Sequence, residues 1–308
     1  MITAEAFVEQ FDRDFDEMKD LAYQLVPKDY TAFCREEGMS GAYIRRSSIS
    51  GLGLPKRARD YDNIPLDAAV KGPIASFTPT TYKLGYIIDR QSIDDEQYGH
   101  LADRPATMLY GAGLIRDLYA ADLLNGGTAT QTWDLAGLPL FSASHVREDG
   151  VTTWSNRNAA DLPITVETVM QAIIDYLFNL KDMRGYIIAY GGTYRIYVPA
   201  ISATLVRQAV EVANSMMNPN TSDNRINAVT KQFKIEVVPL RYLTSSTAWF
   251  IGWEPSAQHY GLVMFNRSEP EITPLTQMSN NPDAWLSRMR LRFTGGYDQK
   301  RGIARIGA

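Results

Sequence analysis

Ser142 and His145 are the residues whose types could support nucleophilic catalysis, and both lie in the stretch 137–145, read as GLPLFSASH. A nucleophile elbow needs glycine on both sides of the serine, because a strained turn must lift the hydroxyl clear of the chain. Here the neighbours are Phe141 and Ala143. In an extended chain, the serine and the histidine would also point to opposite faces. The stretch therefore predicts a structural junction, apolar and buried in its extended first half, whose polar side chains bond the nearby backbone.

Metal chemistry has no recognisable ligand set in the sequence. The three histidines, His100, His145 and His259, are too far apart for a local zinc motif. Cys34 is the single cysteine, which excludes an intrachain disulfide framework and a cysteine-based zinc site. We assign no metal ligand, and we expect stability to come from packing or from assembly.

Acid–base and cofactor chemistry have no better support. Asp60 and Asp62 fall in an expected loop, and Asp94 and Asp95 fall at an expected helix start, where carboxylates ordinarily cap or are solvated. The Gly-Leu-Gly at 51–53 lacks the third glycine of a dinucleotide fingerprint. We assign no catalytic residue and no cofactor, and predict that the chain is not an enzyme.

Composition bounds the fold and the partners. A chain of 308 residues with 45% hydrophobic content fits about two packed units. Thirty-one basic against 35 acidic residues give a net charge of −4, which provides no global attraction for nucleic acid and argues against sequence-specific DNA binding. We interpret the basic clusters at 45–46, 56–59 and 288–292 as solvated or inter-subunit surface. No apolar run is long enough for a membrane span, and the acidic first residues are unlike a signal peptide, so we expect folding in the cytoplasm.

Five segments have the periodicity or the caps of helices. Residues 4–25 carry an apolar stripe that ends before Pro27 and must be covered by this chain or by another copy. The most regular helix opens at Pro105, after Asp103 as a cap, and stops at Gly126-Gly127. A shorter helix starts with Ser92 as its cap. The other two expected helices are 166–181, capped by Thr165, and 202–214.

The stretch 38–89 is rich in glycine and proline and has no apolar face of its own. Its end, 74–89, alternates as a single strand, and with the region around 44–52 it predicts a long two-stranded excursion. Such an excursion has no core of its own to fold against, so we expect it to lie on a neighbouring molecule.

The remaining pattern predicts an α+β fold with a central sheet flanked by helices. Residues 133–163 are rich in loops, and 218–227 form a polar loop. The expected strands are 185–198, 233–240, 248–253, 262–265, 285–293 and 303–306.

In order and motif, the chain resembles the major capsid proteins of tailed phages with the Hong Kong 97-type fold, and most closely the major head subunits of Mu-like prophages. The resemblance covers roughly residues 45–308, and its motifs are specific as a series. They are YKLGYIIDRQSIDD at 82–95, Tyr98-Gly99, the long helix ending at Leu124-Asn125, GLPLFSASH, Arg184-Gly185, Tyr197-Val198-Pro199, Val237-Val238-Pro239-Leu240 and Ala248-Trp249-Phe250.

The resemblance implies a division of the chain into four parts. These are an N-terminal arm at 1–37, an extended hairpin called the E-loop at 38–89, a peripheral domain with a long spine helix at 90–160 and 266–308, and an axial domain at 161–265. The N-terminal stretch matches the family least. Because no scaffold-like domain precedes it, we expect any scaffolding function on another protein.

The resemblance also implies the function. It implies self-assembly into hexamers and pentamers of an icosahedral shell that encloses the double-stranded DNA of a phage or prophage. The implied partners are other copies, then portal, scaffolding and decoration proteins, with packaged DNA contacted non-specifically and no membrane. The implied location is the virion, after assembly in the host cytoplasm.

Two alternatives stay open on sequence grounds: an encapsulin-like cellular compartment, which shares the fold, and a hydrolase. One branch of the fold locks its shell with lysine–asparagine isopeptide bonds, and Lys56, Lys71, Lys83, Asn280 and Asn281 supply the residue types. Nothing in the sequence provides the buried carboxylate or the dry pocket that this reaction needs. We therefore predict no covalent cross-link.

Overall fold

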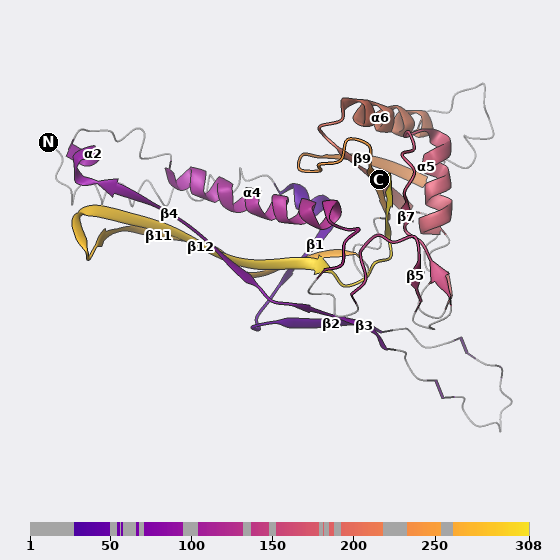
Figure 1. Cartoon of the computed structure of the whole chain (residues 1–308), viewed down its shortest axis with the longest axis horizontal. Helices are drawn as coiled ribbons and strands as arrows, with labels where there is room; N and C mark the ends of the chain where they lie inside the picture. Colours follow the sequence, from indigo (N-terminus) through magenta and orange to yellow (C-terminus); the bar gives the residue numbers. More distant parts are fainter. Residues whose placement is uncertain are drawn as a thin grey trace.

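The protein is elongated, with a long arm at one end and a compact lobe at the other (Figure 1). The arm contains a four-stranded sheet covered by one long helix, whereas the lobe contains a five-stranded sheet and two further helices. A hairpin projects beside the base of the arm sheet. The computed structural model describes residues 28–49, 54–55, 57, 66–67, 71–94, 104–131, 137–147, 152–178, 181, 185–187, 192–217, 233–253 and 261–307. The predicted helix at 4–25, the polar loop 218–227 and the cap Asp103 lie outside these residues.

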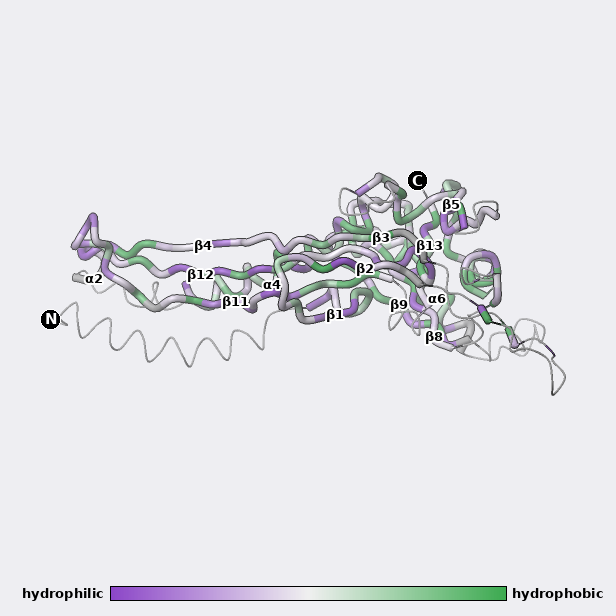
Figure 2. The backbone as a smooth tube through the Cα atoms, turned by 90° about the horizontal axis from the view of Figure 1, so that it is seen from below, coloured by the Kyte–Doolittle hydropathy of each residue, from purple (hydrophilic) through white to green (hydrophobic). Residues whose placement is uncertain are grey.

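The arm sheet has the strand order β1-β11-β12-β4. Two long strands, β11 (Leu262–Met278) and β12 (Asn281–Tyr297), form an antiparallel hairpin, far longer than the predicted strands at 262–265 and 285–293. At one edge β1 (Cys34–Gly38) runs parallel to β11, and at the other β4 (Thr80–Asp89) runs antiparallel to β12. Hydrophilic and hydrophobic residues alternate along the arm strands (Figure 2). Such alternation gives the sheet one apolar and one polar face.

Helix α4 (Arg104–Asn125) covers the apolar face, as its predicted row of apolar side chains requires. Its buried Met108, Ala112 and Leu124 join Met289 and Leu291 of β12 in one core cluster. The helix does stop before Gly126-Gly127, but neither glycine is left-handed, so they do not end it in the usual way. The reason for glycine at 127 is space: a Cβ there would meet the Phe141 ring at 2.6 Å.

The hairpin of β2 (Ile44–Ile49) and β3 (Lys71–Phe77) corrects the prediction of one strand over 74–89. The strand breaks at 78–79, where proline removes a backbone donor, and the chain continues as β4 in the arm sheet. The prediction that 38–89 has no core of its own is also wrong at this end. Phe77 is completely buried and packs against Phe265 of β11, with ring centroids 5.0 Å apart.

The lobe contains the five-stranded sheet β7-β13-β10-β8-β9. Three of its strands follow the predicted bounds: β9 (Phe233–Leu240), β10 (Trp249–Trp253) and β13 (Ile303–Ile306). The short β7 (Arg157–Asn158) pairs parallel to β13. β8 (Gly192–Pro199) starts later than the predicted 185, where Gly185 has a φ of +90°, outside the extended range.

Helices α5 (Val166–Ala172) and α6 (Ala203–Met217) pack on this sheet and confirm the predicted helices, and a π-helical turn, η2 (Ile173–Phe178), extends α5. Thr165 caps α5 as predicted, because its Oγ1 accepts a hydrogen bond from the Thr168 amide at 3.2 Å. In contrast, the short α2 (Arg90–Asp94) begins two residues before Ser92, so that serine lies inside the helix and does not cap it.

The lobe sheet recruits two strands from outside 161–265. Both β7 and β13 belong by sequence to the predicted peripheral domain, yet all four residues of β13 are buried between β10 and β7. Four consecutive apolar or amphipathic residues cannot show which of two sheets they enter, because both offer a buried position. The sheet therefore links the two ends of the second half of the chain.

Candidate assembly surfaces

The stretch 137–145 is the junction that its sequence predicts, and it joins the end of α4 to the lobe. Leu140 and Phe141 have no exposed surface, which confirms the predicted burial, although the chain there bends and forms no strand. The Phe141 amide donates to the Gly127 carbonyl at 2.8 Å, and its ring lies 5.4 Å from that of Phe250 in β10. The close contact with Gly127 ties the helix end to the lobe sheet.

Asn156 holds this junction to the C-terminal strand, and its buried side chain uses both of its polar atoms. Its Nδ2 donates to the carbonyls of Leu140 at 2.8 Å, Lys300 at 3.0 Å and Ile303 at 3.3 Å. Its Oδ1 accepts from the Ser142 amide at 2.9 Å. Sequence reasoning missed this residue, because an asparagine in a loop-rich stretch carries no signal of long-range contacts.

His145 begins β5 (His145–Val146) and is buried beside Asn156. Its Nε2 lies 3.0 Å from Asn156 Oδ1 and 3.3 Å from the Leu140 carbonyl, and its ring stacks on Trp154 of β6 (Thr153–Trp154), with centroids 4.5 Å apart. Desolvation lowers the pKa of His145 to about 4, so the ring is neutral near pH 7. The Nε2–H of the neutral ring donates a hydrogen bond to these two acceptors, and this bond holds the loop.

Ser142 is not the partner of His145. Its Oγ accepts from the Ser144 amide at 3.1 Å, which confirms the prediction that polar side chains of the junction bond nearby backbone. The pair therefore has the bonding of a structural turn and lacks the serine–histidine contact of a hydrolase.

The other chemical candidates are not brought together. Cys34 is buried and unbonded to another cysteine, and burial raises the pKa of its thiol, so it is a poor nucleophile. Asp94 ends α2, whereas His100, His259, Asp60, Asp62 and Asp95 lie outside the described residues. Within the described ranges, no three histidine, cysteine or acidic side chains gather as metal ligands. No helix in those ranges is long and apolar enough to span a bilayer.

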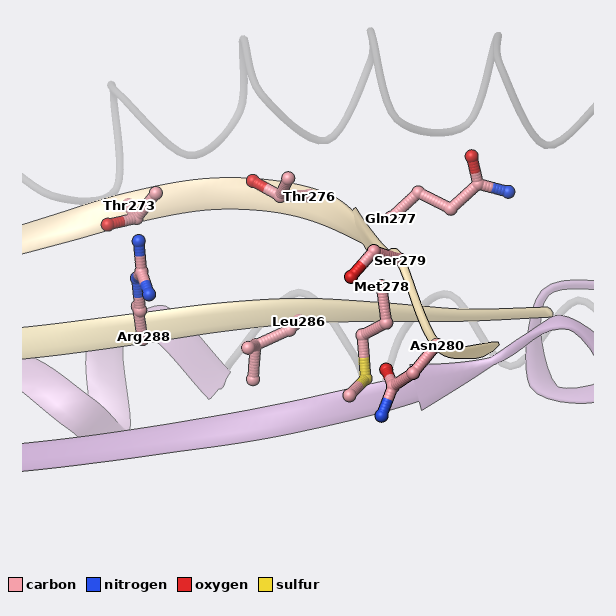
Figure 3. Close-up of a pocket in the computed structure, with 8 residues that line it drawn as sticks. All are labelled: Thr273, Thr276, Gln277, Met278, Ser279, Asn280, Leu286 and Arg288. Carbon is pink, nitrogen blue, oxygen red and sulfur yellow. The ribbon is translucent and has the colours of Figure 1, made fainter. Parts of the chain in front are cut away.

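Two hollows of the described surface are shallow and open. One, of about 220 Å³, lies at the tip of the arm and is shown in Figure 3. The other, of about 280 Å³, lies beside α5 and Ile306. Neither contains the buried polar groups that an active site needs.

Several surfaces are incomplete in a single copy. Strand β4 is a ten-residue edge with an unpaired side, and its Leu84 and Ile87 are about half exposed. In the hairpin excursion, Leu54 is 66% exposed and Leu66 is 93% exposed. Long edges and exposed apolar side chains are liabilities for a protein that stays monomeric, and are typical of one that associates.

The segment that enters from the N-terminal side is anchored on the helix side of the arm sheet. In the short helix η1 (Asp29–Ala32), the Tyr30 amide donates to Asp117 Oδ1 of α4 at 2.9 Å. Asp29 accepts from Arg241 at 2.6 Å. Burial raises the pKa of Asp117 to about 6, so the ionised carboxylate present near pH 7 destabilises the folded state.

Comparison with known proteins identifies this architecture. The chain is similar to the procapsid protein of bacteriophage JBD30, with a TM-score of 0.52 and 15% identity, covering 100% of this chain and 76% of that chain. It is also similar to the capsid of Helicobacter pylori bacteriophage KHP30 (TM-score 0.52, 7% identity, covering 88% of this chain and 87% of that chain). The head of Helicobacter pylori bacteriophage KHP40 gives a TM-score of 0.52 at 9% identity, covering 88% and 87%. These likenesses confirm the predicted α+β fold of the Hong Kong 97 type. No curated protein matches the chain.

The family comparison goes beyond the fold. The model of the family described as phage capsid protein matches residues 74–306, well over half of the chain. This match confirms the predicted structural, non-enzymatic role and gives no support to a hydrolase or a cellular compartment. The chain belongs to the phage capsid protein family, and it is a major capsid protein.

Proposed function

We propose that this chain is the major head subunit of a tailed phage or prophage of the Mu-like group. Copies assemble into hexamers and pentamers of an icosahedral shell that encloses double-stranded DNA. The observation that carries the proposal is the family match over residues 74–306, on a fold shared with subunits of phage procapsids and heads. The Mu-like assignment rests on the motif series that starts with YKLGYIIDRQSIDD at 82–95.

The four proposed parts of the subunit are an arm at 1–37, an E-loop at 38–89, a peripheral domain at 90–160 and 266–308, and an axial domain at 161–265. In this division the axial domain meets its copies around the capsomer axis and draws β7 and β13 into its sheet. The peripheral domain supplies the long arm. The apolar stripe of the N-terminal arm and the tip of the E-loop would each be buried on a neighbouring subunit.

Incomplete surfaces of the single copy support this assembly. Among the described residues, nothing covers the exposed Leu54 and Leu66 or pairs with the outer edge of β4, and a second copy would supply partners for them. Burying such surface between identical copies supplies the association free energy, while small differences in contact allow pentamers and hexamers from one sequence.

The proposed location is the virion, after assembly in the host cytoplasm. The proposed further partners are portal, scaffolding and decoration proteins, with packaged DNA contacted non-specifically and no membrane. The net charge of −4 gives no global attraction for DNA, so the proposed contact with packaged DNA is weak and sequence-independent.

Expression of the chain with electron microscopy of the purified product tests the proposal. We expect closed shells with five-fold and six-fold capsomers. A product that sediments as a monomer across a range of salt and crowding conditions contradicts the proposal.

A further inference from the structure

The arm sheet has a second face, opposite α4, which is open along most of its length. At its base the β2–β3 hairpin covers this face, with Phe77 and Ala75 packed on Val263 and Phe265. Beyond the hairpin, the residues of β12 that point away from α4 are Leu286, Arg288, Arg290 and Arg292. The structure describes no element that covers this row.

The row is basic and largely unpaired. Arg288, Arg290 and Arg292 recur at every second position, so they lie about 6.7 Å apart on one face. Lys83 of β4 is registered with Arg290 and adds a fourth cation. Within the described residues, no ion pair or hydrogen bond engages Arg288, Arg290 or Lys83, and Arg292 Nε is buried without a hydrogen-bond partner. The nearest carboxylate in register is Glu271, opposite Arg290, and it forms no ion pair with the row.

The face ends in the hollow at the tip of the arm. Figure 3 shows Arg288 rising from β12 toward Thr273 on β11. Leu286 is in register with Thr276 and also lines the hollow. Ile87 of β4, which is 49% exposed, is registered with Leu286 and adds apolar surface there. The face thus presents three arginines over about 13 Å, from Arg292 to Arg288, and then an apolar end at Leu286.

The chain supplies an acidic segment of opposite charge. Residues 1–27 contain seven of the 35 acidic residues and only two of the 31 basic ones. Five of the acids recur at spacings of four, three, four and four, which places them on one side of the helix predicted at 4–25, opposite its apolar stripe. From the first to the last, this acidic row extends about 22 Å along the helix axis. Its members are Glu5, Glu9, Asp12, Asp16 and Asp20.

We propose that the acidic row of residues 5–20 docks on the arginine row of the arm sheet in a neighbouring copy. The two rows carry opposite charge and have similar spacings, of about 5–6 Å between the acids and about 6.7 Å between the arginines. The acidic row is longer than the arginine row and also passes the apolar end of the face, and the long arginine side chains absorb the difference in spacing. The apolar stripe of the segment then faces away from the arginines and is free to bury against a further surface of the shell. The inference rests on the proposed function, because the shell supplies the neighbouring copy.

A neighbour, and not the same copy, provides the face. Tyr30 is bonded to Asp117 of α4, so the segment enters the fold on the helix side of the sheet. The route around the nearby β1 edge is occupied by the hairpin, where Arg46 of β2 pairs with Glu37 of β1. The open face of the sheet in the same copy therefore lies on the side opposite to the one where the N-terminal segment enters.

Nucleic acid is the other polyanion that could meet the row. The chain as a whole is acidic, with 35 acidic against 31 basic residues, so it repels DNA at long range. In a shell, every subunit brings its own acidic segment close to a neighbour, so the local concentration of this segment is high. This favours the segment over a polyanion that must diffuse to the row.

Zero-length carbodiimide coupling on assembled, full-length particles tests the contact, because Lys83 is the one amine in the row. Particles are assembled from a mixture of isotopically heavy and light subunits. We expect Lys83 coupled to an acid of residues 5–20, with mixed heavy–light pairs. Lys234 and Glu236, whose Nζ and Oε1 lie 2.7 Å apart, provide a positive control for the reagent.

The outcomes separate this inference from the proposed function. Absence of shells overturns the proposed function. Shells in which Lys83 stays uncoupled, or couples only within one subunit, overturn the docking while the shell function stands.

Charge exchange supplies a functional readout. Arg288→Glu with Arg290→Glu should raise the subunit concentration needed for assembly by about 5- to 30-fold, as should Glu9→Lys with Asp12→Lys. Combining the two pairs should restore assembly, which damage to the fold cannot do. If the combination assembles no better than either pair, or if the arginine changes only reduce the nucleic acid retained in shells, the proposal is wrong.

Discussion

Asn156→Ala removes the side chain that connects the junction 137–145 to the C-terminal strand. The side chain makes five hydrogen bonds of 2.8 to 3.3 Å, to Leu140, Lys300, Ile303, Ser142 and His145. A buried hydrogen bond contributes a net stabilisation of about 0.5–1.5 kcal/mol, and a buried group left unpaired costs about 1–3 kcal/mol. Because three of the bonds share one nitrogen, their contributions are not additive, and we expect a loss of about 3–5 kcal/mol.

Such a loss is large against the usual total of about 5–15 kcal/mol for a folded domain. It should be measured on dissociated subunits by urea unfolding, followed through tryptophan fluorescence. Hydrogen exchange gives a local check, since the Arg305 amide donates to the Asn156 carbonyl at 3.0 Å. Amides of β13 should exchange at least about 100-fold faster in the variant.

The matched control is Asn158→Ala, two residues further along the chain. Asn158 Oδ1 accepts a single exposed hydrogen bond, from the Ala160 amide at 2.9 Å, so its loss should cost less than about 1 kcal/mol. If Asn156→Ala costs no more than Asn158→Ala, the side-chain network does not hold the C-terminal strand, and the reasoning is refuted.

Three further predictions concern titration and covalent chemistry. Because burial lowers the pKa of His145 to about 4, folding favours the neutral ring, and the free energy of unfolding should fall by roughly 3 kcal/mol as the pH drops from about 6.5 to 4. His145→Gln should remove this pH dependence in urea titrations. An unchanged pH dependence contradicts the lowered pKa of His145. Because burial raises the pKa of Asp117 to about 6, its ionised form destabilises the folded state above that pH. Asp117→Asn should raise the free energy of unfolding by about 1–2 kcal/mol at pH 7.5 and leave it unchanged below pH 4. A lower free energy of unfolding at pH 7.5 would show that the carboxylate is required. Finally, mature particles boiled in detergent should run as one band near 34.5 kDa, since Lys83 is exposed on β4 and in no dry pocket, whereas a ladder of covalent oligomers would show that cross-links form.

The helices were predictable because their signals are local. A period near 3.6 residues with a cap at Thr165, or a proline at 105, determines a helix without knowledge of the rest of the chain. Ser92 failed as a cap because a serine is accepted both before and inside a first turn.

Strand partnership could not be predicted from the same patterns. β13 reads as an apolar strand wherever it lies, and its place between β10 and β7 depends on contacts far away in sequence. The long β11–β12 hairpin was also underestimated, because its outer half alternates arginines with buried residues, and short apolar runs were all that the pattern revealed. The junction at 137–145 was predictable as a junction, whereas the role of Asn156 was not, since its partners are spread from Leu140 to Ile303.

The order in which chain segments become available constrains how the lobe folds. β7 at 157–158 pairs with β13 at 305–306, so the first strand of this sheet waits until the whole arm has been synthesised. Until then β10 has an open edge, which is a site for mispairing with other nascent chains. The last strand to arrive closes that edge and places Asn156 against the Ile303 carbonyl in one event. The lobe sheet is therefore complete only after the arm has been made, and a subunit that lacks β13 keeps the edge of β10 open.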